Sequence, residues 1–134
     1  MQSSARMLKE KGVRPSLQRV CVLHYLRGVK THPTVDEIYS ALLPECPSLS
    51  RTTVYSTLEL LCSNHLAISL DFGEGFLRYD ADCSPHCHFF CDKCKRVFDV
   101  FTPPPDCVQM VPDGFILKGT ALYMFGRCRE CSAE

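Results

Sequence analysis

The chain has 134 residues, of which 46% are hydrophobic, so its length and composition suit one globular domain or two small ones and argue against disorder. Fifteen basic and fifteen acidic residues cancel, so the net charge identifies no class of partner. There is no run of about 18 apolar residues that could span a membrane, and the opening MQSSARMLKEKG lacks the apolar core of a secretory signal. We therefore expect a cytoplasmic protein, in which ten cysteines indicate metal ligands or redox thiols rather than disulfides.

Positive charge is concentrated at the start of the chain. Residues 1–30 contain seven Lys or Arg and one acid, whereas residues 31–80 contain two basic residues and seven acids. A basic segment of this kind can be a solvated helix face or a surface that attracts phosphates, and the charge pattern alone leaves both interpretations open.

The first half of the chain has the pattern of three helices. In the first, the residues that recur at helical spacing are Val13, Leu17, Val20, Cys21 and His24. Pro15 suits its start and Gly28 its end. Thr34 followed by Glu37 predicts a capping box for the second helix. The residues expected on its buried face are Ile38, Ala41 and Leu42.

A third helix and a hairpin are predicted next. Ser50 can cap the stretch SRTTVYSTLELLC, in which Val54, Leu58 and Leu61 share one face. Alternation of apolar and polar residues over 66–71, the turn-prone GEG and then FLRYD indicate a β-hairpin. Three helices followed by a hairpin are typical of a winged helix-turn-helix, whose third helix can enter the major groove of DNA.

The composition changes after Asp80, so we expect two domains, residues 1–80 and 81–134. Two short strands are predicted within residues 88–101, followed by the turn-rich TPPPDCVQMVPDG. FILKGTALYMFG is predicted to form two more strands that turn at Gly119. The expected fold class is therefore α+β. A β-rich unit of about 50 residues is rarely stable by its apolar core alone, so we expect a metal site or a covalent cross-link to stabilise it.

The chain has two CxxC pairs that can provide this stabilising site, Cys91 with Cys94 and Cys128 with Cys131. Each pair lets two thiolates reach one ion, and two pairs complete a tetrahedral structural zinc site. The alternatives are free buried cysteines or a thioredoxin-like redox motif, but the latter needs a βαβ context that this segment lacks.

A second set of potential ligands contains histidine and aspartate. In an extended strand, His86 and His88 point to one face, and Asp80, Asp82 and Asp99 lie on neighbouring segments. Two surface histidines are the plain alternative. With the carboxylates, the set has nitrogen and oxygen donors only, which suits Fe(II), Mn(II) or Zn(II).

These motifs, taken in order, resemble the ferric uptake regulator superfamily of bacterial metal-dependent repressors. LKEKGVRPSLQRVCVLHYL resembles its first DNA-domain helix, THPTVDEIYSAL its second, and SLSRTTVYSTLELLCSNHLA its recognition helix with the following turn. HCHFFCDKCKRVFDV and GRCREC resemble parts of its dimerisation domain.

The resemblance is strongest to the peroxide-sensing branch, whose regulatory site has three histidines and two aspartates. The matching residues are His32, Asp80, His86, His88 and Asp99. They imply a site for Fe(II) or Mn(II) at which peroxide oxidises a ligand histidine.

Other branches of the superfamily remain as alternatives. Iron-sensing members more often have glutamate and a further site, but the matching positions here are Pro85, Cys87 and Thr120. Zinc-sensing members often use a cysteine ligand, so Cys83 and Cys87 leave an iron- or zinc-uptake regulator as an alternative.

The resemblance implies a homodimeric repressor that binds an A·T-rich inverted repeat in double-stranded DNA. The candidate DNA contacts are Arg14, Arg19, Arg51, Thr53 and Tyr55. Two departures from the family bear on this: residues 102–114 have room for only a short helix, and Ser56 replaces a larger polar residue.

Competing classes fit the motifs less well, and we do not expect an enzyme. A zinc deaminase would need H-x-E and P-C-x-x-C, whereas this chain has HCHFFC and CDKC. A thiol redox protein is a distant alternative. A protein-interaction domain stabilised by zinc is another, but it would leave the capped third helix unexplained.

Overall fold

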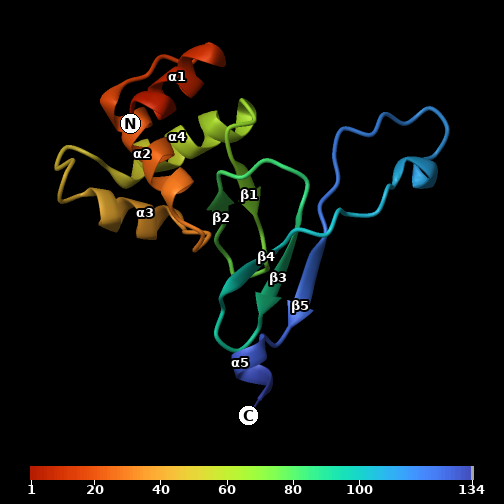
Figure 1. The fold of residues 1–134 in the computed structure, drawn as a ribbon. Helices are drawn as coiled ribbons and strands as arrows, with labels where there is room; N and C mark the ends of the chain where they lie inside the picture. Colours follow the sequence, from red (N-terminus) through yellow and green to blue (C-terminus); the bar gives the residue numbers. More distant parts are fainter. Residues whose placement is uncertain (134) are drawn as a thin grey trace. The chain divides into compact units, whose positions relative to one another are not determined.

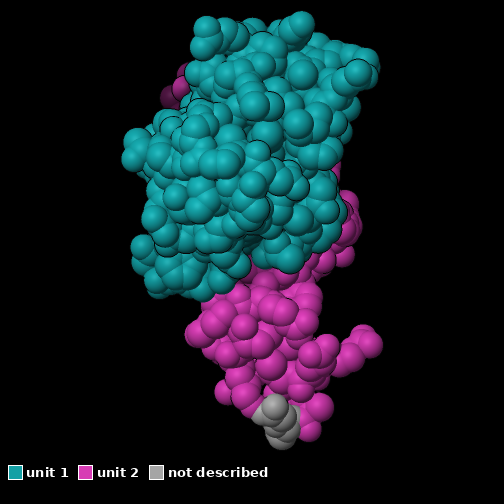
Figure 2. Space-filling view, turned by 90° about the vertical axis from the view of Figure 1, so that its left-hand side faces the viewer, with its two compact units in different colours: residues 1–83 teal, residues 84–134 magenta. Residues whose placement is uncertain are grey.

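The computed structural model describes residues 1–133 (Figure 1), and Glu134 lies outside the described residues. The chain divides into two compact units, residues 1–83 and 84–134 (Figure 2). The division follows Cys83, slightly later than the change in composition after Asp80 had indicated.

The first unit is a helical bundle with a two-stranded wing. Its elements are α1 (Gln2–Glu10), α2 (Leu17–Gly28), α3 (Val35–Leu42), α4 (Arg51–Ser63), β1 (Ile68–Leu70) and β2 (Arg78–Asp80). The two strands pair in antiparallel register, with Ile68 opposite Asp80 and Leu70 opposite Arg78. The predicted winged helix-turn-helix is confirmed, and α1 is a helix that the sequence analysis did not predict.

Three helix starts in this unit are fixed by side-chain caps. The Ser16 and Ser50 hydroxyls accept hydrogen bonds from the Arg19 and Thr53 backbone N–H groups. At α3, Thr34 and Glu37 form both hydrogen bonds of the predicted capping box. Each cap satisfies a donor that the first turn of a helix would otherwise leave without an acceptor.

The core of the first unit matches the prediction fully for α4 and only in part for α2. Val54, Leu58 and Leu61 are fully buried, as predicted. On α2, however, Leu17 is 66% exposed and His24 is exposed. The residues that α2 buries are Val20, Val22, Leu23 and Leu26. The prediction holds for Val13 and Val20, which are buried, but not for Leu17 and His24. Because α2 is contacted by α1, α3 and α4, its buried surface is wider than one stripe and is rotated from the predicted one.

The helix α1 explains part of that difference. It packs on α2 and buries Leu8 and Ser4 completely. Arg27 of α2 donates a hydrogen bond to the Ser4 hydroxyl at 3.0 Å, so the buried polar atom has a partner. On α3, Ile38 and Leu42 are buried as predicted, whereas Ala41 is exposed.

The second unit is a small three-stranded sheet. Its elements are β3 (Cys87–Cys91), β4 (Val97–Val100), the 3₁₀ helix η1 (Val108–Met110), β5 (Tyr123–Gly126) and α5 (Arg129–Ser132). The strand order is β4-β3-β5, with β3 antiparallel to β4 and parallel to β5. The two predicted strands around the first cysteine turn are thus confirmed.

The hairpin predicted over FILKGTALYMFG is wrong. Only its last part forms a strand, Tyr123–Gly126, and this strand pairs with β3 rather than with residues 115–122. Phe115 and Ile116 are 70% and 84% exposed, so their apolar side chains have no buried surface in this chain to pack against. A segment with an apolar strand pattern forms a strand only where a partner strand lies beside it.

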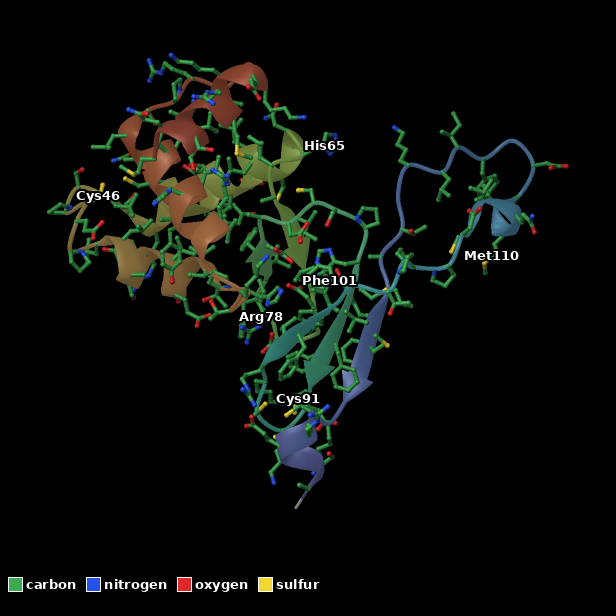
Figure 3. All side chains as sticks on the ribbon, in the orientation of Figure 1. Cys46, His65, Arg78, Cys91, Phe101 and Met110 are labelled. Carbon is green, nitrogen blue, oxygen red and sulfur yellow. The ribbon has the colours of Figure 1, made fainter. Side chains whose placement is uncertain are left out.

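Residues 101–122 form an exposed segment, the apolar arm, which extends away from the sheet of its own unit (Figures 1 and 3). Within residues 102–114 the only helix is the single turn η1, which confirms the prediction of at most a short helix. The large apolar residues that the arm exposes are Phe101, Val108, Met110, Phe115, Ile116, Leu117 and Leu122.

Among the described residues, no helix combines the length and the apolar character needed to cross a membrane.

Candidate metal centres and DNA-facing helix

The four cysteines of the two CxxC pairs meet at one end of the second unit, where Figure 3 labels Cys91 beside α5. Their sulfur atoms all lie within 4.8 Å of one another, and those of Cys94 and Cys128 are 3.9 Å apart. Four sulfurs bound to one zinc at about 2.3 Å in tetrahedral geometry would lie about 3.8 Å from one another. The quartet therefore fits a closed tetrathiolate zinc site.

The parallel pairing of β3 with β5 brings the two cysteine turns together. Cys91 lies opposite Gly126, and the Asp92 N–H donates to the Gly126 carbonyl at 2.8 Å, so Cys128 follows directly beside the first turn. Gly126 leaves room for the Phe89 ring at this point, because a Cβ there would lie 3.1 Å from Cζ of Phe89. The 33 residues between the pairs are thus spanned by sheet pairing rather than by one compact finger.

Hydrogen bonds and burial set the charge state of the sulfurs. Burial by itself would raise the pKa of Cys91, but backbone N–H groups, led by that of Cys128, lower it to about 5. Burial and the neighbouring sulfurs raise the pKa of Cys131 to about 12. Backbone hydrogen bonds thus favour the charged form of Cys91, whereas burial and the neighbouring sulfurs disfavour the charged form of Cys131, and a bound dication would stabilise the thiolates of both.

A second set of donors, in the second unit, comes from the residue before β3, from β3 and from β4. His88 and Asp99 are direct cross-strand partners. Nε2 of His86 and Nε2 of His88 each lie 3.3 Å from the same atom, Oδ1 of Asp99. The Nδ1 atom of His86 is 2.7 Å from the Ser84 carbonyl oxygen, which orients the ring toward Asp99.

A third set, in the first unit, consists of His32 and Asp80. His32 Nε2 lies 3.4 Å from Asp80 Oδ2, and both side chains are nearly fully buried. The other carboxylate oxygen of Asp80 accepts a hydrogen bond from the Asp82 N–H at 2.8 Å. Asp82 therefore supports Asp80 through its backbone, whereas the sequence analysis had offered its carboxylate as a ligand.

The backbone at His32 is held in a sparsely populated conformation. Its φ angle is +54°, in the left-handed region that non-glycine residues rarely adopt. The Tyr79 N–H donates to the Pro33 carbonyl at 3.0 Å, and Arg78 donates to the His32 carbonyl at 3.3 Å. These hydrogen bonds hold this conformation, in which the His32 side chain lies beside Asp80.

The nitrogen-to-oxygen distances in both sets fit metal ligation. Values of 3.3 and 3.4 Å exceed the usual 2.7–3.2 Å of a hydrogen bond. Two donors bound about 2.1 Å from one ion would lie about 3.0–3.4 Å apart in octahedral or tetrahedral geometry. The donors are nitrogen and oxygen only, which suits Fe(II), Mn(II) or Zn(II).

The two cysteines near these donors do not have the character of reactive thiols. Partial burial, together with the carboxylates of Asp80 and Asp82, raises the pKa of Cys83. Cys87 is buried, and its thiol donates to the Thr102 carbonyl oxygen at 3.6 Å. Reactive cysteines combine exposure with a lowered pKa, a combination that neither residue provides.

The exposed face of α4 contains two of the five predicted DNA contacts, Arg51 and Tyr55. Tyr55 is 48% exposed and lies one helical turn after Arg51. Thr53 is partly buried, and its hydroxyl contacts the Ser50 hydroxyl at 2.9 Å, so it serves the cap of α4. Arg14 is exposed on the segment before α2, where its carbonyl accepts a hydrogen bond from the Arg19 guanidinium at 3.1 Å.

Arg51 has partners that the sequence analysis missed. Its Nε donates to Asp36 Oδ1 at 2.8 Å, and its guanidinium carbon lies 4.6 Å from the centre of the Tyr39 ring. Both partners come from α3, so the contact depends on the packing of two helices and has no local signal in the sequence.

The chain combines a winged helix-turn-helix, a small sheet with a four-cysteine cluster, and His/Asp metal donors. This combination defines a metal-dependent DNA-binding regulator. The family model described as "Ferric uptake regulator family" matches residues 10–118. The chain therefore belongs to the ferric uptake regulator family of metal-dependent regulators.

Curated relatives match the chain over its full length. The peroxide operon regulator of Bacillus subtilis (strain 168) is 35% identical over 137 residues, covering 100% of this chain and 94% of the relative. The peroxide-responsive repressor PerR of Staphylococcus epidermidis is 31% identical, covering 100% of this chain and 91% of the relative.

Solved structures of the family have the same fold. The Helicobacter pylori ferric uptake regulator, reported with three functional metal-binding sites, superposes with a TM-score of 0.75 at 23% identity, covering 98% of this chain and 90% of that one. PerR from Streptococcus pyogenes, described as sensing peroxide, gives a TM-score of 0.53 at 24% identity, covering 92% of this chain and 87% of that one.

Proposed function

We propose that this protein is a dimeric transcriptional repressor that uses a regulatory Fe(II) or Mn(II) ion to respond to peroxide. The ligands of the regulatory ion are His32, Asp80, His86, His88 and Asp99. Those of the structural zinc are Cys91, Cys94, Cys128 and Cys131. The observation that carries the proposal is the sulfur-free donor set, with its nitrogen-to-oxygen distances of 3.3–3.4 Å. The full-length relatives named as peroxide regulators support it.

The regulatory ligands come from both units of the chain. His32 and Asp80 belong to residues 1–83, and the other three belong to residues 84–134. An ion bound by both sets would favour one relative orientation of the units over all others. It would act through its higher affinity for the orientation that binds DNA.

The response to peroxide changes a ligand. Fe(II) held by these five residues would supply the one-electron chemistry that cleaves the peroxide O–O bond. In the net reaction an imidazole C–H becomes C–OH, its tautomer being the 2-oxo form, and hydrogen peroxide leaves as one water. His32 and His86 are the proposed targets. An oxidised imidazole is a poorer ligand, so the ion is lost and repression ends.

The DNA-binding surface is the exposed face of α4 with the basic segment before and along α2. Tyr55 is the proposed base contact, because an aromatic ring can pack on a thymine methyl group. Arg14, Arg19 and Arg51 are the proposed phosphate contacts. In a dimer, two such helices would bind half-sites of an A·T-rich inverted repeat about 34 Å apart.

The apolar arm supports dimerisation. Its side chains include Ile116 and Met110, which are 84% and 78% exposed. A single soluble chain rarely exposes so many large apolar residues in one segment, and such a surface marks a protein interface. We propose that the arm and the exposed Phe125 on the edge strand β5 pack against a second copy of the chain.

We also propose a cytoplasmic location and a regulatory rather than enzymatic role. None of the ten cysteines, which all lie within the described residues, is in a disulfide. Cysteines without disulfides, four of them proposed zinc ligands, suit a reducing compartment, and the family consists of regulators.

The test is operator binding by protein loaded separately with Fe(II), Mn(II) or Zn(II), before and after hydrogen peroxide. We expect peroxide to release DNA from the iron form only, with one added oxygen on His32 or His86 by mass spectrometry. DNA release with unmodified histidines would assign sensing to thiols. Unchanged DNA binding with unmodified histidines would instead identify an iron- or zinc-uptake regulator.

A further inference from the structure

Arg96 contacts two sulfur atoms of the cysteine quartet. Its Nε donates to Cys94 Sγ at 3.4 Å, and its Nη2 lies 3.8 Å from Cys128 Sγ. Cys94 belongs to the first CxxC turn and Cys128 to the second. One guanidinium therefore joins two turns that lie 34 residues apart along the chain.

Two further contacts hold the guanidinium in place. Its Nη2 donates to Glu130 Oε2 at 2.9 Å, and its central carbon lies 5.2 Å from the centre of the Phe98 ring. Phe98 in turn packs against the buried cysteines. A planar guanidinium fixed from two sides can direct its N–H groups at fixed acceptors, which a flexible ammonium group does less well.

The charge of the site gives this contact its effect. Four thiolates around one dication carry a net charge of −2, so N–H donors to sulfur stabilise the assembly. The Cys128 N–H donates to Cys91 Sγ at 3.4 Å, and Arg96 adds a full positive charge beside Cys94.

Cys94 is the exposed member of the quartet, whereas the other three cysteines are buried. A chelator or an oxidant would therefore reach the site first at the Cys94 sulfur. A hydrogen bond to a thiolate lowers its nucleophilicity, so the residue that covers Cys94 controls how fast the site can be opened.

We propose that Arg96 is a positioning residue of the cysteine site, whose guanidinium ties Cys94 to Cys128 and slows the loss of bound zinc. The inference rests on the proposed assignment of zinc to these four cysteines. It gives the chain a means of keeping its structural ion while peroxide reacts at the histidines. In the competing reaction, two thiolates transfer two electrons to hydrogen peroxide, which takes up two protons and leaves as two waters. The thiolates then form a disulfide and the zinc is released.

The test compares zinc release from the full-length protein and three variants: Arg96→Gln, Arg96→Lys and Arg127→Gln. Release is followed with a colorimetric chelator, with and without hydrogen peroxide. Arg127 is the matched control because it directly precedes Cys128 at the second cysteine turn, is 55% exposed, and bonds the Asp92 carboxylate at 3.1 Å. We expect Arg96→Gln to release zinc about 10-fold faster or more, Arg96→Lys to be intermediate, and Arg127→Gln to match the parent within about twofold.

A second measurement separates a direct effect on sulfur from a loss of structure. In protein loaded with Co(II), the sulfur-to-cobalt charge-transfer band should move to longer wavelength in Arg96→Gln, because sulfur loses a hydrogen bond. The band should be unchanged in Arg127→Gln. An unchanged band in Arg96→Gln would contradict the proposed contact.

The outcomes distinguish this inference from the zinc assignment. A zinc-free parent protein would overturn both. A parent that holds zinc, with Arg96→Gln releasing it at the parental rate, would overturn the role of Arg96 alone. If Arg96→Gln does not fold, Glu130→Gln removes one anchor of the guanidinium. It should then speed release several-fold, and an unchanged rate would overturn the inference.

Discussion

The two units of this chain are stabilised by different means. In residues 1–83, a continuous apolar core includes Leu23, Ile38, Leu58 and Leu61, and side-chain caps fix three helix starts. In residues 84–134, the sheet is short, and one of its buried clusters consists of three cysteines with Phe98 packed against them. The first unit is held by the hydrophobic effect, whereas the second needs its ion, because a unit of its size buries too little apolar surface.

The largest expected effect is therefore the loss of a zinc ligand. Cys131→Ser should release zinc and unfold the second unit, because the free energy of metal binding here is free energy of folding. The first unit should keep its structure. Zinc content and backbone hydrogen exchange measure the two parts separately.

Cys107→Ser is the control for that change, because Cys107 lies on the apolar arm and its thiol contacts only the nearby Pro105 carbonyl among the described contacts. It should retain zinc and a folded second unit. A zinc-free Cys131→Ser protein whose β3 amides keep their normal protection from hydrogen exchange would contradict the claim that the second unit needs zinc to fold.

Truncation of a core side chain in the first unit should have the opposite effect, because it should destabilise the first unit and leave the second unit with its zinc. Leu58 is fully buried, so Leu58→Ala should lower the free energy of unfolding of residues 1–83 by about 2–5 kcal/mol. Zinc content should not change. Thermal unfolding, monitored by the helical circular dichroism signal, measures this change in the free energy of unfolding. Loss of zinc from this variant would mean that the two units do not fold independently.

Removal of a helix cap should have a smaller effect in the same unit. Thr34→Ala eliminates the hydroxyl that accepts the Glu37 N–H at 3.2 Å. The expected loss is about 1 kcal/mol, because one first-turn donor then depends on water alone. Urea unfolding of the variant beside Thr31→Ala, an exposed threonine outside the helix, isolates the cap. Equal midpoints for the two variants would argue against a role for the cap.

The smallest effect on stability, and a distinct effect on DNA, is expected at Asp36. Its ion pair with Arg51 is exposed at 74% and 63%, so Asp36→Asn should change the free energy of unfolding by less than about 0.5 kcal/mol. The variant frees a positive charge at the start of α4. We expect tighter binding to unrelated DNA and a steeper dependence on salt, measured by fluorescence anisotropy. Unchanged binding to unrelated DNA would show that Arg51 does not face phosphates.

Local signals in the sequence predicted the elements that local chemistry sets. The capping box at Thr34, the Ser50 cap, the buried face of α4 and the wing all depend on residues within a few positions of one another. The clustering of the four CxxC cysteines was also predictable, because two CxxC turns can bring four thiolates to one point. The proximity of His86, His88 and Asp99 followed from residue alternation and a short hairpin.

Contacts between distant segments were decided only by the tertiary structure. The buried face of α2 depends on where α1 and α3 pack, and residues 115–122 lack the strand partner that their pattern would need. The parallel register of β3 with β5 sets Cys128 beside Cys91, and the packing of side chains then sets Arg96 on two sulfurs and Arg51 on Asp36. These contacts join residues whose separation along the chain has no fixed relation to their distance in space, so neither periodicity nor spacing could reveal them.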